Sequence, residues 1–181
     1  MILFVNACVR HGSRTKLLAD RLLKSAKEPV TEIRLFEIDF PVVDEAFLKK
    51  RDSLIQSGSF DAPSLSLARQ FAEADEIIIA APFWDLSFPA SLKQYIEQIN
   101  VIGVTFCYTA EGLPRGLCKA KKLTYVTTAG GDFFPEEFGF GYIKSLCEHF
   151  YGIKEVELVK ATGLDMEGHD PDAILNAVKT K

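Results

Sequence analysis

Residues 2–15 read ILFVNACVRHGSRT, an apolar run followed by a polar loop, and this stretch decides between two folds. The run from Ile2 to Ala7 predicts a first β-strand. A Rossmann dinucleotide site needs the pattern G-x-G-x-x-G directly after that strand, but the segment from Asn6 to Thr15 contains a single glycine, Gly12. The loop therefore favours the other common doubly wound strand order, 2-1-3-4-5.

The rest of the chain alternates β-rich apolar runs with amphipathic stretches, which is typical of a parallel sheet covered by helices on both faces. The run from Glu76 to Ala81 is expected at the centre of the sheet because parallel strands buried on both faces are apolar throughout. Strands are expected at residues 2–7, 30–36, 76–81, 122–127 and 155–161, and helices at 15–27, 45–56, 63–74, 143–150 and from Asp170 onward. A further helix is expected around the apolar stripe of Leu92, Tyr95, Ile96 and Ile99. The prediction is one α/β domain, residues 1–181, with a flavodoxin-like doubly wound five-stranded parallel sheet.

Composition limits the function classes. Hydrophobic residues make up 48% of the chain and charged residues 25%, as in ordinary globular proteins, and the net charge of −4 gives no positive field for nucleic acid.

The longest apolar run, Ile77 to Trp84, is far shorter than the about 20 residues that a membrane-spanning helix needs. No secretory signal is visible, so we expect a cytoplasmic protein. Four cysteines without C-x-x-C spacing and three histidines predict no metal site.

The loop after the first strand has the features of an anion site. Ser13 and Thr15 bring hydroxyls, and Arg10 and Arg14 bring charge, to the N-terminus of the first helix. Free backbone N–H groups and the helix dipole favour a phosphate at such a position. The alternative is that Ser13 or Thr15 only caps the helix.

The same loop also fits a sharper pattern, C-x5-R-[ST], formed by Cys8, Arg14 and Thr15. This is the phosphate loop of tyrosine phosphatases, in which the cysteine is the nucleophile. Asp170-Pro171 is similar to the general acid that the small phosphatases carry late in their chain. A low-molecular-weight tyrosine-phosphatase-like hydrolase that uses Cys8, Arg14 and Asp170 is therefore one alternative function.

A second loop carries a more specific resemblance. Pro82-Phe83-Trp84-Asp85-Leu86 leads into a helix that contains Leu92-Lys93-Gln94-Tyr95. These motifs, together with Gly103 to Thr109 and Thr127 to Gly131, resemble the FMN-dependent NAD(P)H:quinone oxidoreductase and azoreductase family of flavodoxin-like proteins. The resemblance covers most of residues 1–150.

The resemblance implies FMN as cofactor, NADH or NADPH as reductant, and two-electron ping-pong transfer to a quinone or azo compound. Cys8 departs from the family pattern, in which serine is frequent at this position. Tyr108 and Phe133 are the substrate-side candidates, and Phe133 and Phe134 form a possible lid. The cofactor-binding residues that we expect are Arg10, Ser13, Arg14, Thr15, Pro82, Phe83, Trp84, Asp85, Leu86, Thr128, Ala129, Gly130 and Gly131.

The resemblance also implies a homodimer with its active site near the interface. An apolar stripe of Ile96, Ile99 and Val101 next to the aromatic loop would permit it. A flavodoxin-like electron carrier without catalysis is the second alternative function. Short flavodoxins are strongly acidic, whereas the charge of −4 is mild, so this alternative is the less favoured one.

Overall fold

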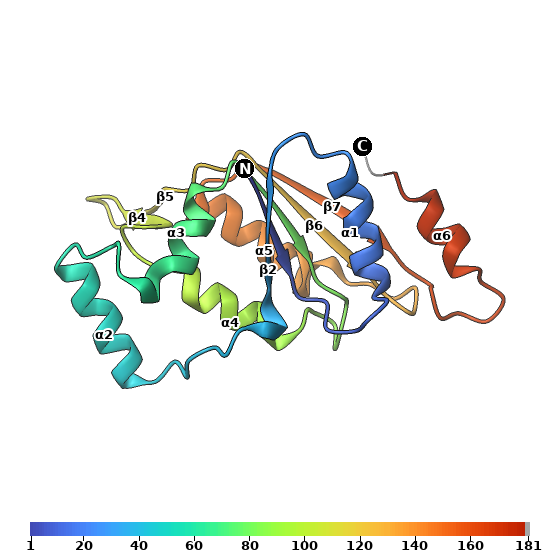
Figure 1. Ribbon diagram of the computed structural model, residues 1–181, viewed down its shortest axis with the longest axis horizontal. Coiled ribbons are helices and arrows are strands. Elements are labelled where there is room, and N and C mark those ends of the chain that lie inside the picture. Colours follow the sequence, from blue (N-terminus) through green and yellow to red (C-terminus); the bar gives the residue numbers. More distant parts are fainter. Residues whose placement is uncertain (180–181) are drawn as a thin grey trace.

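The computed structural model describes residues 1–179 and has five parallel strands at its centre (Figure 1). Their order is β2-β1-β3-β6-β7, which confirms the predicted order because β6 and β7 are the fourth and fifth strands of this sheet. The strands are β1 (Ile2–Asn6), β2 (Val30–Arg34), β3 (Glu76–Ala80), β6 (Lys122–Thr128) and β7 (Glu155–Ala161). Connections between parallel strands run over the faces of the sheet, and the helices lie there.

Helices cover both faces of the sheet. Figure 1 shows α3 and α4 on the left of the strands and α1 and α6 on the right. The helices are α1 (Arg14–Lys24), α2 (Glu45–Gln56), α3 (Ser66–Glu73), α4 (Ala90–Ile99), α5 (Phe140–Leu146) and α6 (Pro171–Ala177), and α5 continues as a π-helical turn, Cys147–Tyr151. Within residues 1–179, no helix has the length and apolar character needed to cross a membrane.

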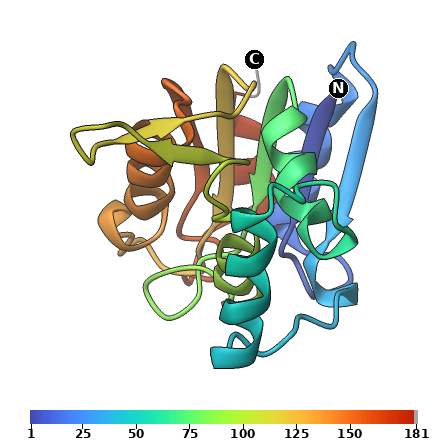
Figure 2. The same ribbon diagram turned by 90° about the vertical axis from the view of Figure 1, so that its left-hand side faces the viewer.

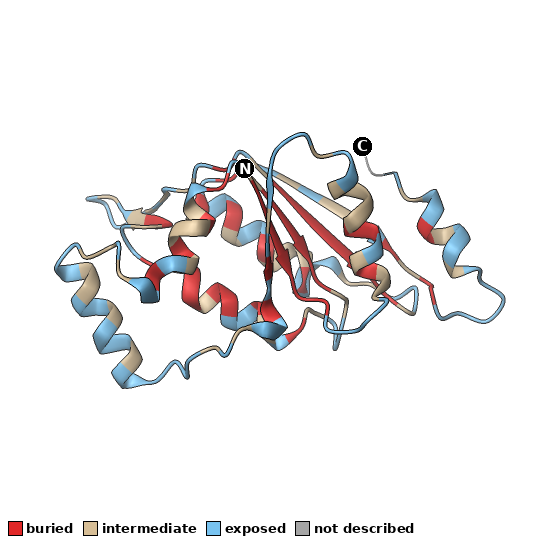
Figure 3. Cartoon of the chain, viewed as in Figure 1, coloured by how far each residue is buried: buried red, intermediate tan, exposed pale blue. Residues whose placement is uncertain are grey.

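Alternate residues of each strand enter two separate cores. Leu3 and Val5 of β1 face the core that contains α3, α4 and α5, whereas Ile2 and Phe4 face the core that contains α1 and α6. All of β1 is buried, and the strands form the buried layer of Figure 3. This alternation follows from the period of two in a β-strand, and it fixes the register because a shift by one residue would exchange the two faces.

Two features differ from the sequence-based expectation. Strands β1, β2 and β3 end earlier than predicted, whereas β6 ends one residue later, at Thr128. A 3-10 turn, Leu35–Glu37, follows β2. A small antiparallel hairpin, β4 (Phe106–Tyr108) and β5 (Pro114–Gly116), stands apart from the main sheet and was not predicted. Strands of three residues are too short to give a period-two pattern. The hairpin packs closely on the turn after α5, because a Cβ at Gly116 would overlap the backbone of Tyr151.

The predicted helix at residues 45–56 is present as α2, but it lies at the edge of the fold. Figure 2 shows it standing in front of the other elements. Asp44 caps its first turn by accepting a hydrogen bond from the Phe47 N–H group at 2.8 Å, and none of its residues is buried. Its main polar tie to the body is the hydrogen bond from Arg51 Nη1 to the Glu97 carbonyl oxygen, at 3.3 Å.

Two buried tyrosines near Phe71 provide a matched test of the core. The Tyr151 hydroxyl donates to Asn100 Oδ1 at 2.7 Å, whereas the Tyr95 hydroxyl has no hydrogen-bond partner among the described residues. A buried hydroxyl without a partner costs free energy, and a paired one contributes about 1 kcal/mol. Tyr95→Phe should therefore raise the free energy of unfolding by about 1 kcal/mol, and Tyr151→Phe should lower it by a similar amount.

Thermal or denaturant unfolding measures both changes, with a shift in Tm of about 2–4 °C per kcal/mol for a chain of this size. Equal destabilisation by the two substitutions would contradict the assignment of Tyr95 as an unpaired hydroxyl.

Candidate functional site

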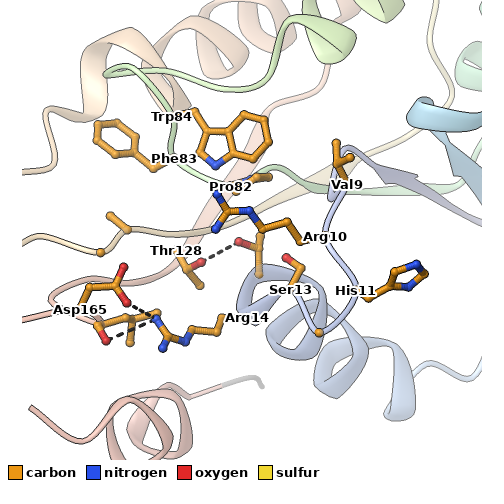
Figure 4. Close-up of a pocket in the computed structure, with 15 residues that line it drawn as sticks. Val9, Arg10, His11, Ser13, Arg14, Pro82, Phe83, Trp84, Thr128 and Asp165 are labelled. Atoms are coloured by element: carbon orange, nitrogen blue, oxygen red, sulfur yellow. Dashed lines mark hydrogen bonds and ion pairs between the residues drawn. The ribbon is translucent and has the colours of Figure 1, made fainter.

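A pocket lies at the carboxyl edge of the sheet, where the loops after β1, β3, β6 and β7 meet. Its volume is about 510 Å³, within the range of small-molecule sites of about 300–1,000 Å³. In a doubly wound sheet this edge is where ligands bind. Figure 4 shows the lining residues: Val9, Arg10, His11, Gly12, Ser13, Arg14, Thr15, Pro82, Phe83, Trp84, Thr128, Ala129, Gly130, Leu164 and Asp165.

One end of the pocket is formed by the start of α1. Gly12 has a φ of +71°, a conformation that glycine adopts easily, and it turns the chain into the helix. Ser13 is the N-cap, and its hydroxyl accepts a long hydrogen bond from the Lys16 N–H group at 3.4 Å. In the described part of the chain, the backbone N–H groups of Arg14 and Thr15 have no acceptor. This end of the pocket is therefore a donor-rich anion site.

A buried hydrogen bond connects this end to β6. The hydroxyl oxygens of Thr15 and Thr128 are 2.6 Å apart, and both residues are buried. The Phe83 N–H group donates to the Thr128 carbonyl oxygen at 3.1 Å, so Thr128 also ties the loop after β3. Three loops from distant parts of the sequence are thus held together by one residue.

The other end of the pocket is aromatic. Phe83 and Trp84 follow β3, and the ring of Phe134 packs on Phe83 with centroids 4.6 Å apart. The Arg10 guanidinium lies 5.9 Å from the centroid of the Trp84 ring, and Figure 4 shows it pointing toward that ring rather than toward Ser13. The pocket therefore offers a flat apolar wall at one end and hydrogen-bond donors at the other.

The aromatic loop closes in a tight two-residue turn. Trp84 and Ser87 exchange two backbone hydrogen bonds, at 3.1 and 2.8 Å, and the residues between them, Asp85 and Leu86, have φ values of 51° and 67°. This is the left-handed region, which asparagine, aspartate and glycine tolerate but which strains a leucine. Ser87 anchors the turn through its hydroxyl, which donates to the Phe138 carbonyl oxygen at 2.7 Å.

The phosphatase alternative does not fit this geometry. Burial raises the pKa of the Cys8 thiol to about 11, and the Sγ atom faces the Ala80 carbonyl oxygen at 3.7 Å. A nucleophilic cysteine needs a lowered pKa and an open approach. Asp170, the expected general acid, instead caps α6 by accepting from the Asp172 and Ala173 N–H groups. Cys8 and Asp170 are therefore structural residues.

Most of the predicted site residues lie in this one pocket, although their role in binding stays a prediction. The exceptions are Asp85, Leu86 and Gly131, which neighbour lining residues without lining the pocket themselves. Tyr108 lies on the β4–β5 hairpin, where it packs on Phe106, and it does not line the pocket. Phe133 also stands outside, with 76% of its surface exposed, and its neighbour Phe134 packs on Phe83 as part of the wall.

Sequence reasoning missed five lining residues: Val9, His11, Gly12, Leu164 and Asp165. Val9, His11 and Gly12 belong to the loop after β1, which the sequence predicts to be an anion site. Leu164 and Asp165 follow β7, whose end lies at the same edge of the sheet as the ends of β1, β3 and β6. Ligands bind at the carboxyl ends of parallel strands, and this rule could have identified the loop after β7 as part of the site from the sequence.

Comparison with known proteins gives a consistent result. A family model described as "Flavodoxin-like fold" matches residues 1–181. The chain is 37% identical to the "FMN-dependent NADH:quinone oxidoreductase" of Clostridium beijerinckii, with 94% of this chain and 88% of that protein covered. It is 38% identical to the protein of the same name in Clostridium perfringens, with 92% and 88% covered.

A solved structure agrees with these relatives. The crystal structure of an azoreductase from Bacillus anthracis superimposes with a TM-score of 0.83 at 27% sequence identity. The superposition covers 97% of this chain and 93% of that one.

Proposed function

This chain belongs to the family of proteins with the flavodoxin-like fold, and from this premise we propose that it is an FMN-dependent NAD(P)H oxidoreductase that reduces quinones or azo compounds. Two relatives that are 37% and 38% identical bear the name FMN-dependent NADH:quinone oxidoreductase, and a structural neighbour is an azoreductase. The observation that carries the proposal is the pocket, which pairs an aromatic wall with an anion site at a helix N-terminus. We place the protein in the cytoplasm, the compartment that supplies NADH.

The residues of the pocket suit FMN. Its phosphate requires donors, and Ser13, Arg14, Thr15 and the free N–H groups of the loop provide them. Its ring system requires a flat apolar slot, which Phe83 and Trp84 would form on one side. Ala129 and Gly130, at the end of β6, also line the pocket.

When bound, the flavin supplies the redox chemistry, accepting two electrons from the nicotinamide and passing them to the acceptor. The chain itself needs no nucleophile. Its residues would bind and orient the cofactor, and the contact of Phe134 with Phe83 would hold the Phe83 ring in place. The substrate-side roles of Tyr108 and Phe133 remain predictions.

The first prediction from this proposal concerns activity. The purified protein, supplied with FMN, should retain the flavin through gel filtration and should oxidise NADH or NADPH when a quinone is present. Absorbance of the bound flavin and consumption of the nicotinamide measure the two steps.

The control is Cys8→Ser, which should retain flavin binding and quinone reduction because the thiol is buried and faces a carbonyl group. Failure to bind either FMN or FAD, together with aryl phosphate hydrolysis that Cys8→Ser abolishes, would replace this proposal by the phosphatase alternative.

A second prediction concerns the phosphate. Ser13→Ala combined with Thr15→Val removes both hydroxyls and should weaken FMN by several-fold to about a hundredfold, since each hydrogen bond to a charged group is worth about 1.5–3 kcal/mol before compensation. The affinity of the same variant for riboflavin, which lacks the phosphate, should fall much less.

Thr15→Val also leaves the Thr128 hydroxyl unpaired, so unfolding of the variant is measured alongside. Equal loss of affinity for FMN and riboflavin would show that the two hydroxyls do not act on the phosphate.

We also propose a homodimer with the pocket near its interface. The stripe of Ile96, Ile99 and Val101 cannot provide that interface, because all three side chains are buried in the core beside α4. The apolar surface is elsewhere, on the loops and the hairpin. Its members are Trp84, Leu86, Tyr108, Leu113, Leu117, Phe133 and Phe138. A contiguous exposed apolar patch marks an interaction surface, and we propose that these residues contribute to such a patch at the interface.

Sedimentation at micromolar concentration should therefore show a dimer. Replacement of Phe138, which is 53% exposed, by glutamate should weaken the dimer because it introduces a charge on the apolar loop. A stable wild-type monomer with unchanged specific activity on dilution would contradict this proposal.

A further inference from the structure

A carboxylate from the far end of the chain lies beside the anion end of the pocket. Asp165 Oδ1 accepts a hydrogen bond from Arg14 Nη1 at 2.6 Å, and the Leu164 carbonyl oxygen accepts from the same nitrogen at 3.3 Å. Figure 4 shows the Arg14 guanidinium pointing toward the Asp165 carboxylate. One nitrogen of the guanidinium is thus occupied, while Nη2 and Nε make no hydrogen bond within the described residues.

The backbone holds Asp165 in place. The Asp165 N–H group donates to the Gly130 carbonyl oxygen at 2.8 Å, and the Gly163 N–H group donates to the Gly131 carbonyl oxygen at 3.0 Å. A Cβ at Gly130 would overlap Asp165 Oδ2 in its present position, so glycine at this point suits the observed placement of the carboxylate. The loop after β7 is therefore fastened to the loop after β6, and the backbone of Asp165 is held in place beside Arg14.

We propose that Asp165 is a positioning residue, which fixes the Arg14 guanidinium so that its free donors face the phosphate of the bound cofactor. The proposal rests on the proposed function. A guanidinium is a rigid planar fork, and a bond at one nitrogen sets the direction of the others. Because Arg14 is ordered before the cofactor arrives, binding does not have to immobilise a long flexible side chain.

The same carboxylate could instead compete with the phosphate for Arg14. The exposure of the pair argues against this alternative. Asp165 is 69% exposed and Arg14 is 40% exposed, so water and salt screen the repulsion between the carboxylate and a nearby phosphate. The geometric constraint on the guanidinium is not screened.

The experiment compares the affinities of FMN and riboflavin, whose ratio isolates the contribution of the phosphate. Asp165→Ala should lower the preference for FMN by about three- to tenfold, the effect of one side chain that must be ordered on binding. Asp165→Asn should retain most of the preference, because its amide oxygen still accepts from Arg14. In an Arg14→Gln background, Asp165→Ala should have no further effect on the ratio.

Asp132→Asn is the matched control. Asp132 is an exposed acid on the neighbouring loop that neither lines the pocket nor contacts Arg14, and its replacement should leave the ratio unchanged. The proposal is overturned if Asp165→Ala raises the preference for FMN, if it lowers both affinities equally, or if Asp132→Asn causes the same loss. Wild-type protein that binds neither flavin would overturn the proposed function as well, whereas flavin binding with an unaltered ratio would overturn only the role of Asp165.

Discussion

The pocket depends on β1 being paired on both sides, with β2 and with β3, in parallel. Asn6, the last residue of β1, is in register with Arg34 of β2 and Ala80 of β3, so these strands end at one level. The loop after β1 leads to α1 on one face of the sheet and the loop after β3 leads to α4 on the other, so a cleft opens between these two neighbouring loops. Asn6 strengthens this edge, because its Oδ1 accepts from the Cys8 N–H group at 2.9 Å and its Nδ2 donates to Glu32 Oε1 at 2.8 Å. The loop after β1 therefore begins from a fixed point.

The two ends of the pocket are built by opposite means. At the anion end, the residues that offer free donors are held in place by hydrogen bonds to other parts of the chain. Thr15, for example, is held by the hydrogen bond between its hydroxyl and that of Thr128. At the aromatic end, the rings are held by packing and by a strained turn at Asp85 and Leu86. Backbone strain of this kind persists where the surrounding structure over-determines it, and here the two backbone bonds between Trp84 and Ser87 and the Ser87 side chain do so.

The parts of the structure that the sequence predicts well are those that depend on local pattern. The five strands, their order and the anion loop after β1 follow from apolar runs, turn residues and the single glycine of that loop. The aromatic loop after β3 follows from the family resemblance. The parts that it predicts poorly depend on contacts between distant segments. The Arg14–Asp165 pair joins residues from opposite ends of the chain, and no local pattern at Asp165 distinguishes it from other surface acids. Ile96 is expected at a dimer interface from the sequence, but it is buried in the core. An apolar stripe on a helix can face either a partner or the core, and the local pattern does not distinguish the two.

The edge position of α2 has a consequence for the distribution of stability along the chain. None of its residues is buried, and of its apolar side chains Leu54 and Ile55 pack against the core, so releasing α2 exposes much less apolar surface than separating the buried strands. The free energy for opening this segment is therefore far below that for separating β1 from its neighbours. Backbone amides of α2 would exchange with solvent through local opening, while those of β1 would exchange only through global unfolding. The chain thus carries one segment that can rearrange on its own without disturbing the sheet that supports the pocket.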